Sequence, residues 1–276
     1  MSVINTNVSA LNAQSALTVN SRNMGVVMQQ LSTGSRINSA KDDAAGLAIS
    51  QNMTSQIRGL DQAVRNANDG ISLLQTADGA LVETSNMLQR MRELGVQSAN
   101  GTLSSTQRGY LNTEFTNLST QIGKIASETV WNGKAILLGT EGDTTSSTFT
   151  FQTGQSSGTT ITATITAMTV SGLVLGAAAV DTQANAVTAL GLVDTALASV
   201  NSQRATIGAV TNRLTYAADN MSNISTNISA SRSRIMDTDY AQATSQLAKT
   251  QIIQQAATAM LAQANQQPQS VLALLK

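Results

Sequence analysis

The sequence predicts a mostly α-helical protein: a long, coiled-coil-like helical bundle with a small β-hairpin insert, in which the N- and C-terminal segments pair. Two patterns support this fold class. Apolar residues recur at alternating spacings of three and four along most of the 276 residues, and strict alternation replaces this spacing near the middle. The first pattern is typical of supercoiled helices, and the second is typical of half-buried strands.

The first helical segment lies within about residues 1–40. Its apolar residues are Ile4, Val8 and Leu11, followed after a step of six by Leu17, Met24, Met28 and Leu31. Asp42 and Asp43 come after it, and adjacent residues on a helix point in different directions. We therefore interpret this pair as the start of the next helix, where the helix dipole favours acidic residues, and not as a catalytic pair.

The longest helix is expected from about Asp43 to Asn100. Its a and d positions are Met53, Ile57, Leu60, Val64, Ala67, Ile71, Leu74, Leu81 and Leu88, and only Asp78 and Ser85 interrupt them. At about 1.5 Å per residue, this helix is roughly 85 Å long. A sustained 3.5-residue repeat predicts a left-handed supercoil with partner helices.

A second inner helix follows a break at residues 100–102. Gly101 is suited to end the long helix, and Ser104 or Ser105 is suited to cap the next one. The apolar residues of this second helix are Leu111, Phe115, Leu118, Ile122 and Ile125. The helix ends before residues 131–134, where Trp-Asn-Gly-Lys is a turn signature.

An insert of about residues 135–175 changes to the β period. Residues 148–152 and 160–166 alternate between apolar and polar side chains, and the Gly- and Ser-rich residues 153–158 lie between them. This arrangement predicts a β-hairpin. Residues 168–175 are expected to add a third strand.

Helical spacing returns near Ala184 and continues to Ile235, and a last helical segment follows from Tyr240. The apolar stripe of that last segment is Ile253, Ala257, Met260, Ala264, Val271 and Leu274. The chain therefore runs out and comes back. We divide it into a terminal helical domain of residues 1–40 and 236–276 and a middle helical domain of residues 41–235, which includes the insert.

The apolar stripes of the two terminal segments lack enough partners within one chain. A thin helical rod has too much surface for its core, so a single copy leaves these stripes exposed. We therefore expect self-assembly, in which the stripes pack against neighbouring copies. The expected assembly seams are Ile4, Val8, Leu11, Ile253, Ala257, Met260, Ala264 and Leu274.

The composition argues against several functional classes. Lys and Arg number 16 and so do Asp and Glu, whereas nucleic-acid binders need an excess of basic residues. Histidine and cysteine are absent, which removes Ser-His-Asp and Cys-His catalysis and Cys/His zinc sites. The acidic residues 237–239 fit a helix N-cap better than a cation site. We expect neither an enzyme nor a protein that binds a cofactor or a metal.

Membrane insertion and a secretory signal are not expected either. The longest apolar run, residues 172–180, is far too short to span a bilayer. The N-terminus lacks the basic stretch and the apolar core of a signal peptide. If the protein is exported, we expect a route that does not read such a signal.

Several motifs resemble one family closely. Residues 2–11 read SVINTNVSAL and residues 31–50 read LSTGSRINSAKDDAAGLAIS; near the other end stand SRSRI at 231–235, DTDY at 237–240 and LAQANQ at 261–266. These segments are similar to the conserved ends of bacterial flagellin, and the resemblance covers about the first 140 and the last 90 residues. Only about forty residues lie between Gly139 and Ala184, so the chain resembles a short flagellin without outer variable domains.

The resemblance implies a structural function. Flagellins polymerise into the flagellar filament, the extracellular helical screw that drives swimming. By this likeness, residues 1–40 and 236–276 form an inner tube and the middle residues an outer tube. The implied partners are further copies of the chain, an export chaperone, the filament cap and the junction proteins, with export through the flagellar secretion apparatus and no cleaved signal peptide.

Two alternatives stay open at this point. A hook–filament junction protein shares the terminal heptads, although it is not expected to keep the whole of residues 31–50. A secreted helical translocator shares the coiled coils, although it is expected to carry a longer apolar membrane segment.

The resemblance also implies recognition by host flagellin receptors. Residues 89–96, QRMRELGV, are similar to a flagellin segment read by an animal receptor, and the implied contact residues are Gln89, Arg90, Leu94, Gln97 and Glu114. In the frame set by Leu81 and Leu88, we expect Leu94 and its polar neighbours to face outward. Residues 29–50 are similar to the peptide read by plant receptors, with Asp42, Asp43 and Gly46 in the implied receptor segment.

Overall fold

The computed structural model describes residues 6–139 and 146–273, with side chains up to residue 266. Five helices account for most of these residues: α1 (Val8–Thr33), α2 (Ala44–Ala99), α3 (Ser105–Glu128), α4 (Gln183–Met236) and α5 (Tyr240–Ala273). The chain forms two compact units. The terminal unit contains the residues up to 57 and those from 226 onward, and the middle unit is Arg58–Ser225.

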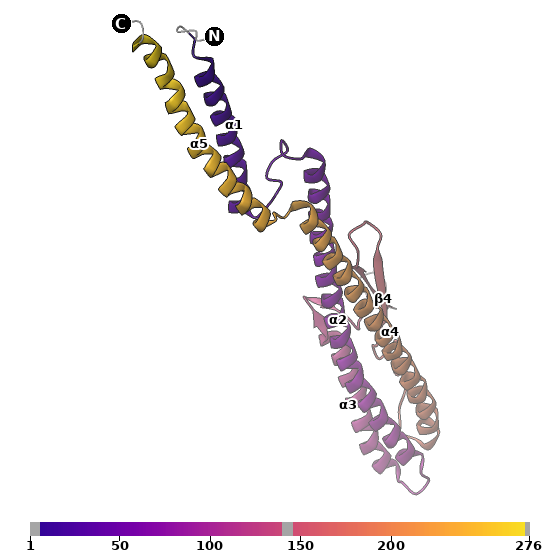
Figure 1. The fold of residues 1–276 in the computed structure, drawn as a ribbon. Helices are drawn as coiled ribbons and strands as arrows, with labels where there is room; N and C mark the ends of the chain where they lie inside the picture. Colours follow the sequence, from indigo (N-terminus) through magenta and orange to yellow (C-terminus); the bar gives the residue numbers. More distant parts are fainter. Residues whose placement is uncertain (1–5, 140–145, 274–276) are drawn as a thin grey trace. The chain divides into compact units, whose positions relative to one another are not determined.

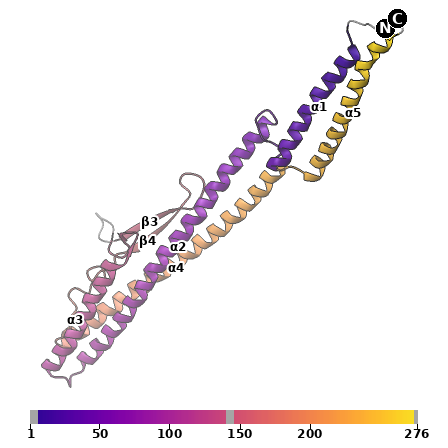
Figure 2. The ribbon, with the colours of Figure 1, turned by 90° about the vertical axis from the view of Figure 1, so that its left-hand side faces the viewer.

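Within the terminal unit, α1 and α5 form an antiparallel pair, and they run side by side in both views (Figures 1 and 2). Three hydrogen bonds fix their register. Asn7 Nδ2 donates to the carbonyl oxygen of Ala264 at 2.7 Å, and Asn20 Nδ2 donates to the carbonyl oxygen of Thr250 at 2.8 Å. The Tyr240 hydroxyl donates to the carbonyl oxygen of Leu31 at 3.4 Å. The pairing of the two chain ends is therefore confirmed.

The contact between α1 and α5 uses small and polar residues as much as large apolar ones. Buried or half-buried side chains recur at 3-4 spacing on both helices: Ala10, Ala13, Leu17, Asn20, Met24, Val27 and Leu31 on α1, and Ala243, Leu247, Thr250, Gln254, Ala257, Leu261 and Ala264 on α5. Of the α1 residues only Asn20 and Val27 are fully buried. This contact is therefore narrow and leaves most of each helix surface open.

The middle unit packs α2 against both α3 and α4. Leu60, Ala67, Leu74, Leu81 and Leu88 of the predicted heptad stripe are buried, and Val64 and Ile71 are half-buried. Met53 and Ile57, on the part of α2 that belongs to the terminal unit, are half-buried as well. Asp78, which interrupts that stripe, is bound at 2.8 Å by Arg204 of α4. The heptad reading of the long helix is therefore confirmed.

Helix boundaries follow the predicted cap residues. Ser104 caps α3 in a capping box, because its hydroxyl accepts the Gln107 N–H while the Gln107 side chain accepts the Ser104 N–H. Asp239 Oδ1 accepts the N–H groups of Ala241 and Gln242 at the start of α5. Each cap satisfies backbone donors that the first helical turn leaves free.

The insert contains the predicted hairpin. Strand β3 (Ser146–Gln152) pairs antiparallel with β4 (Thr160–Thr166), with Phe149 opposite Ala163. The hairpin packs on the middle unit's helices. The Phe151 ring lies 2.9 Å from where a Cβ on Gly70 of α2 would be, and the Gln203 side chain of α4 forms hydrogen bonds with Thr164 and Thr166 of β4. A second short pair, β1 (Val130–Trp131) and β2 (Lys134–Ala135), closes over the predicted Asn-Gly turn.

The expected third strand at residues 168–175 is wrong. The backbone there curls, with the Leu173 N–H bonded to Thr169 at 2.9 Å and the Leu175 N–H bonded to Val170 at 2.9 Å. Groups used in such local turns are not free to join a strand ladder. Leu173 and Leu175 are nevertheless buried, so the apolar run contributes side chains to the core without forming a strand.

The division predicted at residues 40 and 236 coincides with the breaks between α1 and α2 and between α4 and α5. The two compact units instead divide within α2 and α4. The further prediction, that residues 1–40 and 236–276 form the inner layer of an assembly and residues 41–235 the outer layer, stays a prediction. Among the described helices, none is both long enough and apolar enough to cross a bilayer.

Candidate assembly and recognition surfaces

An ion-pair cluster joins α2 to α3 on the surface of the middle unit. The Arg90 guanidinium contacts Glu93 at 2.9 Å through Nη1 and Glu114 at 2.9 Å through Nε. The hydrogen bond to Glu93, followed by that to Glu114, raises the pKa of Arg90. All three side chains are about half exposed, so water screens these pairs and they add little to stability. The structure thus brings Arg90 and Glu114 together at a solvent-facing position.

The expected outward placement of Leu94 is wrong. Its side chain is 1% exposed, and Met91 beside it is fully buried. The neighbouring Gly95 lies 3.0 Å, measured from an added Cβ, from a methyl group of Leu190 on α4. The helix packs on α3 and α4 at once here, so its buried stripe is wider than the single heptad seam from which we placed Leu94.

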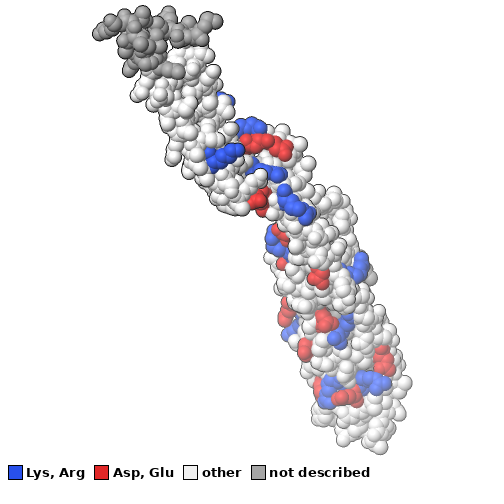
Figure 3. Space-filling view, in the orientation of Figure 1, with Lys and Arg blue, Asp and Glu red and all other residues white. Residues whose placement is uncertain are grey.

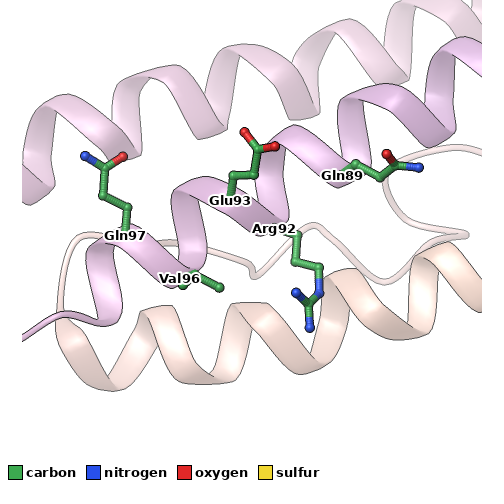
Figure 4. Close-up of a pocket in the computed structure, with 5 residues that line it drawn as sticks. All are labelled: Gln89, Arg92, Glu93, Val96 and Gln97. Carbon is green, nitrogen blue, oxygen red and sulfur yellow. The ribbon is translucent and has the colours of Figure 1, made fainter.

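A shallow groove of about 410 Å³ lies beside the ion-pair cluster. It is lined by Gln89, Arg92, Glu93, Val96 and Gln97, all from α2 (Figure 4). Glu93 and Gln97 point to one side of the helix in this view, and Arg92 and Val96 point to the other. The structure therefore places Gln89 and Gln97 at the surface together, as expected.

Sequence reasoning missed Arg92 and Val96 as members of this surface. Arg92 Nε contacts Asp194 of α4 at 2.7 Å, and hydrogen bonding to that carboxylate raises the pKa of Arg92. Val96 is 53% exposed. The three- and four-residue spacings from Gln89 through Arg92 to Val96 were the available signal, because such residues share one helix face.

The segment between α1 and α2 is held by Asp42 and Asp43. Asp42 Oδ2 accepts the Ser39 hydroxyl and the Ser39 N–H, each at 2.9 Å, and the Asn38 N–H at 3.2 Å. The hydrogen bond from the Ser39 hydroxyl is the largest of the effects that lower the pKa of Asp42. Asp43 Oδ1 accepts the Gly46 N–H at 2.8 Å, which confirms that this pair starts α2.

Gly46 is enclosed by the same local structure. A Cβ at this position would lie 2.5 Å from Asp43 Oδ2 and 2.7 Å from Ile37 Cδ1. Ile37 is itself buried, at 3% exposure. The three residues of the implied plant-receptor segment therefore belong to one compact turn, and any side chain at position 46 displaces the cap.

The terminal unit exposes large apolar side chains that the α1–α5 contact does not use. Of the expected seam residues, Val8 is 54%, Leu11 58%, Ile253 42% and Met260 64% exposed. Ala257 and Ala264 are instead half-buried between α1 and α5. Ile4 and Leu274 lie outside the described residues.

Further exposed apolar residues on the same two helices escaped the sequence reasoning. They are Val19, Val26 and Ile252; Met28, which the sequence placed on the apolar stripe of the first helical segment, is exposed as well. The 3-4 spacing assigned one stripe to each helix, whereas each helix carries apolar residues on two faces. These residues do not form one stripe, because Val26 and Met28 lie on opposite sides of α1. We call the whole exposed set, Val8, Leu11, Val19, Val26, Met28, Ile252, Ile253 and Met260, the terminal apolar face.

Charge is nearly absent from this face. Arg22 and Lys249 are the only charged residues within the bounds of α1 and α5. The visible part of these helices in Figure 3 is correspondingly almost free of blue and red. Exposed apolar surface without charge is typical of a protein-binding surface. Among the described residues, no group of three or more acidic side chains could hold a metal ion.

Two family models match the chain. The bacterial flagellin N-terminal helical region matches residues 4–142, and the bacterial flagellin C-terminal helical region matches residues 190–275. Together they cover well over half of the sequence and include both helices of the terminal unit.

Curated relatives match over the whole chain. A flagellin of Halalkalibacterium halodurans is 45% identical over 276 residues, which is 99% of this chain and 100% of that protein. The flagellar filament 33 kDa core protein of Treponema phagedenis is 41% identical over 285 residues, again 99% of this chain and 100% of that protein. Flagellin A of Vibrio cholerae is 35% identical over an alignment of 380 positions, so it carries extra sequence that this 276-residue chain lacks.

Solved structures agree with these matches. The crystal structure of Bacillus cereus flagellin is 35% identical, with a TM-score of 0.50 over 57% of this chain and 88% of that chain. A putative flagellar hook-associated protein of Vibrio parahaemolyticus has a TM-score of 0.61 over 71% of this chain and 100% of that chain; at 18% identity, it shows the fold alone. From the two family models and the full-length relatives, the chain belongs to the bacterial flagellin family, as a short member that forms a structural subunit of the extracellular flagellar filament.

Proposed function

We propose that this flagellin polymerises by burying its terminal apolar face against neighbouring copies. One observation carries the proposal. The helices α1 and α5 together contain only two charged residues, and they expose large apolar side chains such as Leu11 and Met260. Apolar burial at about 25 cal/mol per Å² is the main source of association free energy for such a face. A helical polymer repeats each contact in every subunit. A small gain in association free energy per side chain therefore adds up along the polymer and makes assembly strongly cooperative.

In this arrangement, α1 and α5 line the inner tube of the filament and the helices of the middle unit form the outer tube. The small residues between α1 and α5 favour this placement, because alanines let two helices approach closely where space near a filament axis is limited. The Ser- and Thr-rich hairpin faces outward, where its polar side chains meet water. The exposed apolar side chains of α1 and α5 and the polar side chains of the hairpin support this proposed arrangement.

Assembly is tested by placing a charge on the terminal apolar face. Ile253→Asp or Met260→Asp puts a carboxylate into an apolar contact at a cost of several kcal/mol, on the order of 3 or more per subunit. We expect no filaments when either variant is added to filament seeds, while the helices of the middle unit keep their circular dichroism signal and cooperative melting.

Ile253→Leu and Met260→Leu are the matched controls, because they keep the site apolar at similar volume. Both controls are expected to give filaments. Normal filaments from both aspartate variants, seen by electron microscopy, would contradict the assignment of this face to assembly.

We further propose that the apolar face of α5 binds the export chaperone before assembly. An unpolymerised copy in the cytoplasm carries the same exposed Ile252, Ile253 and Met260, and a chaperone groove that covers them prevents premature polymerisation. The same proposal includes export through the flagellar secretion apparatus without a cleaved signal peptide. It also includes contacts with the cap and the junction proteins at the filament ends.

For the animal receptor, we propose a contact surface built from Arg90, Glu114, Gln89 and Gln97. Arg90 and Glu114 are joined across two helices, and the two glutamines are exposed on the same helix as Arg90. Leu94 supports this surface from beneath by holding α2 on its neighbours and does not itself reach a receptor. Arginine is frequent among the residues that dominate interface energetics, so Arg90 is the expected anchor.

For the plant receptor, we propose recognition of residues 29–50 as a released peptide. Gly46 is buried in the folded chain, so a receptor that reads this glycine closely needs the turn around Asp43 to open. A synthetic peptide of residues 29–50 is expected to trigger a plant response and Gly46→Ala to weaken it. An inert native peptide would contradict this assignment.

A further inference from the structure

We propose that Met28 and Met260 are oxidation sites that control polymerisation: hydrogen peroxide converts their thioethers to sulfoxides in the free subunit and thereby blocks filament growth. The inference rests on the proposed function, because it assigns both residues to the assembly contact. Four observations support it: the exposure of the two side chains, the burial of other methionines, the charge-free surroundings and the register of α1 with α5.

Exposure separates Met28 and Met260 from the other described methionines. Met28 is 55% exposed on α1 and Met260 is 64% exposed on α5. In contrast, Met91, Met168 and Met221 of the middle unit are at most 4% exposed. The remaining described methionines, Met24, Met53, Met87 and Met236, are half-buried. A dissolved peroxide therefore reaches the thioethers of Met28 and Met260 first, because oxidation follows solvent access.

The reaction needs only the thioether and the peroxide. A sulfur lone pair attacks one peroxide oxygen, the O–O bond breaks, and the oxygen stays on sulfur as the sulfoxide. The sulfur is oxidised by two electrons, and the peroxide is reduced to water after proton transfer. The product is polar and chiral where the parent side chain is flexible and apolar.

The consequence for assembly follows from the surroundings of the two residues. Each belongs to the terminal apolar face, where Arg22 and Lys249 are the only charged side chains on the two helices. Burying a sulfoxide oxygen against a neighbour's apolar side chains leaves a polar acceptor without a partner. The loss is repeated in every subunit that joins the polymer.

The register of the helix pair makes the two sites independent. The bonds Asn7–Ala264 and Asn20–Thr250 place Met260 at the level of Leu11, near one end of the pair. The bond Tyr240–Leu31 places Met28 near the other end. Oxidation at either site therefore damages a different part of the contact, and oxidation at both acts on its whole length.

The test uses the full-length protein. Monomers are treated with hydrogen peroxide, sulfoxide at each methionine is measured by peptide mass spectrometry, and the critical concentration for seeded polymerisation is compared before and after. We expect Met28 and Met260 to oxidise before Met91, Met168 and Met221, and the critical concentration to rise about tenfold or more. Treatment with methionine sulfoxide reductases and a thiol is expected to restore it.

The double variant M28L/M260L keeps volume and apolarity and removes the reactive sulfur. It is expected to polymerise like the unmodified chain and to stay competent after peroxide treatment. Met24→Leu is the matched control, because Met24 lies one turn from Met28 but is half-buried on the α5-facing side. This control is expected to remain as sensitive to peroxide as the unmodified chain.

Several results would overturn the proposal: full sulfoxide at both sites with unchanged polymerisation, loss of polymerisation in the oxidised double variant, or oxidation of the buried methionines first. Failure of the proposed function is recognised separately. In that case the untreated chain does not polymerise on seeds, or the aspartate variants at positions 253 and 260 do.

Discussion

At the scale of single residues, Arg90 and Leu94 illustrate how neighbours on one helix take different roles. Arg90 is half exposed and bonded to two carboxylates, whereas Leu94 is buried under the same surface. Under the proposed receptor surface, variants of the two residues lose activation for different reasons. Removal of Arg90 takes away a proposed contact group, and truncation of Leu94 leaves a cavity that loosens α2.

This difference gives a first prediction. Arg90→Ala is expected to leave thermal stability nearly unchanged, because water screens its exposed ion pairs with Glu93 and Glu114. Leu94→Ala is expected to cost about 2–5 kcal/mol of unfolding free energy through its cavity. Arg90→Ala is expected to reduce receptor activation by monomers about tenfold or more, because it removes the proposed anchor. Leu94→Ala is expected to reduce activation as well, because it loosens the helix that presents Arg90.

Chemical denaturation together with a reporter-cell assay checks this prediction. Met91→Leu provides a buried control, since it preserves volume beside Leu94 and is expected to affect neither readout strongly. A stable Leu94→Ala variant that loses activation would contradict the supporting role and return Leu94 to the contact surface.

A second prediction concerns the pH response of the turn at Asp42. The pKa of Asp42 is lowered in the folded chain, chiefly by the Ser39 hydroxyl. The stabilising effect of its carboxylate is therefore fully present above the ordinary aspartate value of about 3.9 and is lost as the pH falls through the lowered folded value. After correction for intrinsic rates, amide exchange at Asn38 and Ser39 is expected to speed up in that acidic window.

Asp42→Asn removes the titrating group from the same position. In this variant the corrected exchange rates at the two amides are expected to be faster at neutral pH and flat across the acidic window. An identical acid transition in the variant and in the unmodified chain would show that another group controls the turn.

At the scale of secondary-structure elements, much of the fold was predictable because burial within a heptad is local. Leu81 and Leu88 and the cap at Ser104 obey rules that a short window of sequence contains. The buried face of α2 near Leu94 does not, because its width depends on two partner helices that come from elsewhere in the chain. The same holds for α5, whose predicted stripe divides between Ala257, facing α1, and Met260, facing outward.

The expected third strand failed for a related reason. Residues 168–175 are apolar enough for a strand, but their backbone bonds within local turns and Val174 adopts a φ of 56°. A β-branched residue in the left-handed region is uncommon, so no propensity rule points to it. The buried side chains of Leu173 and Leu175 on either side hold it there.

A third prediction belongs to α1 and α5 as elements. Because α1 buries only Asn20 and Val27 fully, the pair has little apolar burial to offset the entropy of ordering two helices. In monomers, amides of residues 8–33 and 245–266 are expected to exchange at least about tenfold faster than those of α2 near Leu81. In filaments the two sets are expected to be similarly protected. Equal, strong protection in monomers would contradict the dependence of these helices on neighbouring copies.

At the scale of the whole molecule, the α1–α5 pair and the middle unit have different surface character. Helices α1 and α5 expose apolar side chains and carry only Arg22 and Lys249 as charged residues, whereas the middle unit carries ion pairs such as Arg92–Asp194 and Arg204–Asp78 on its surface. This contrast suits a subunit whose ends are buried by polymerisation while its middle meets either neighbours or water. A surface of the middle unit that packs on a neighbouring subunit is accessible in the monomer and covered in the filament.

The last prediction follows from that change. If the surface around Arg90 and Glu114 packs on a neighbouring subunit, it is open in monomers and covered in filaments. Monomers are then expected to activate the animal receptor, and cross-linked filaments of the same mass concentration are expected to activate it at least about tenfold less. Arg90→Ala is expected to weaken filaments as well, which heat-induced depolymerisation would reveal. Cross-linked monomers serve as the control for the chemistry, and equal activation by monomers and intact filaments would show that this surface stays open in the polymer.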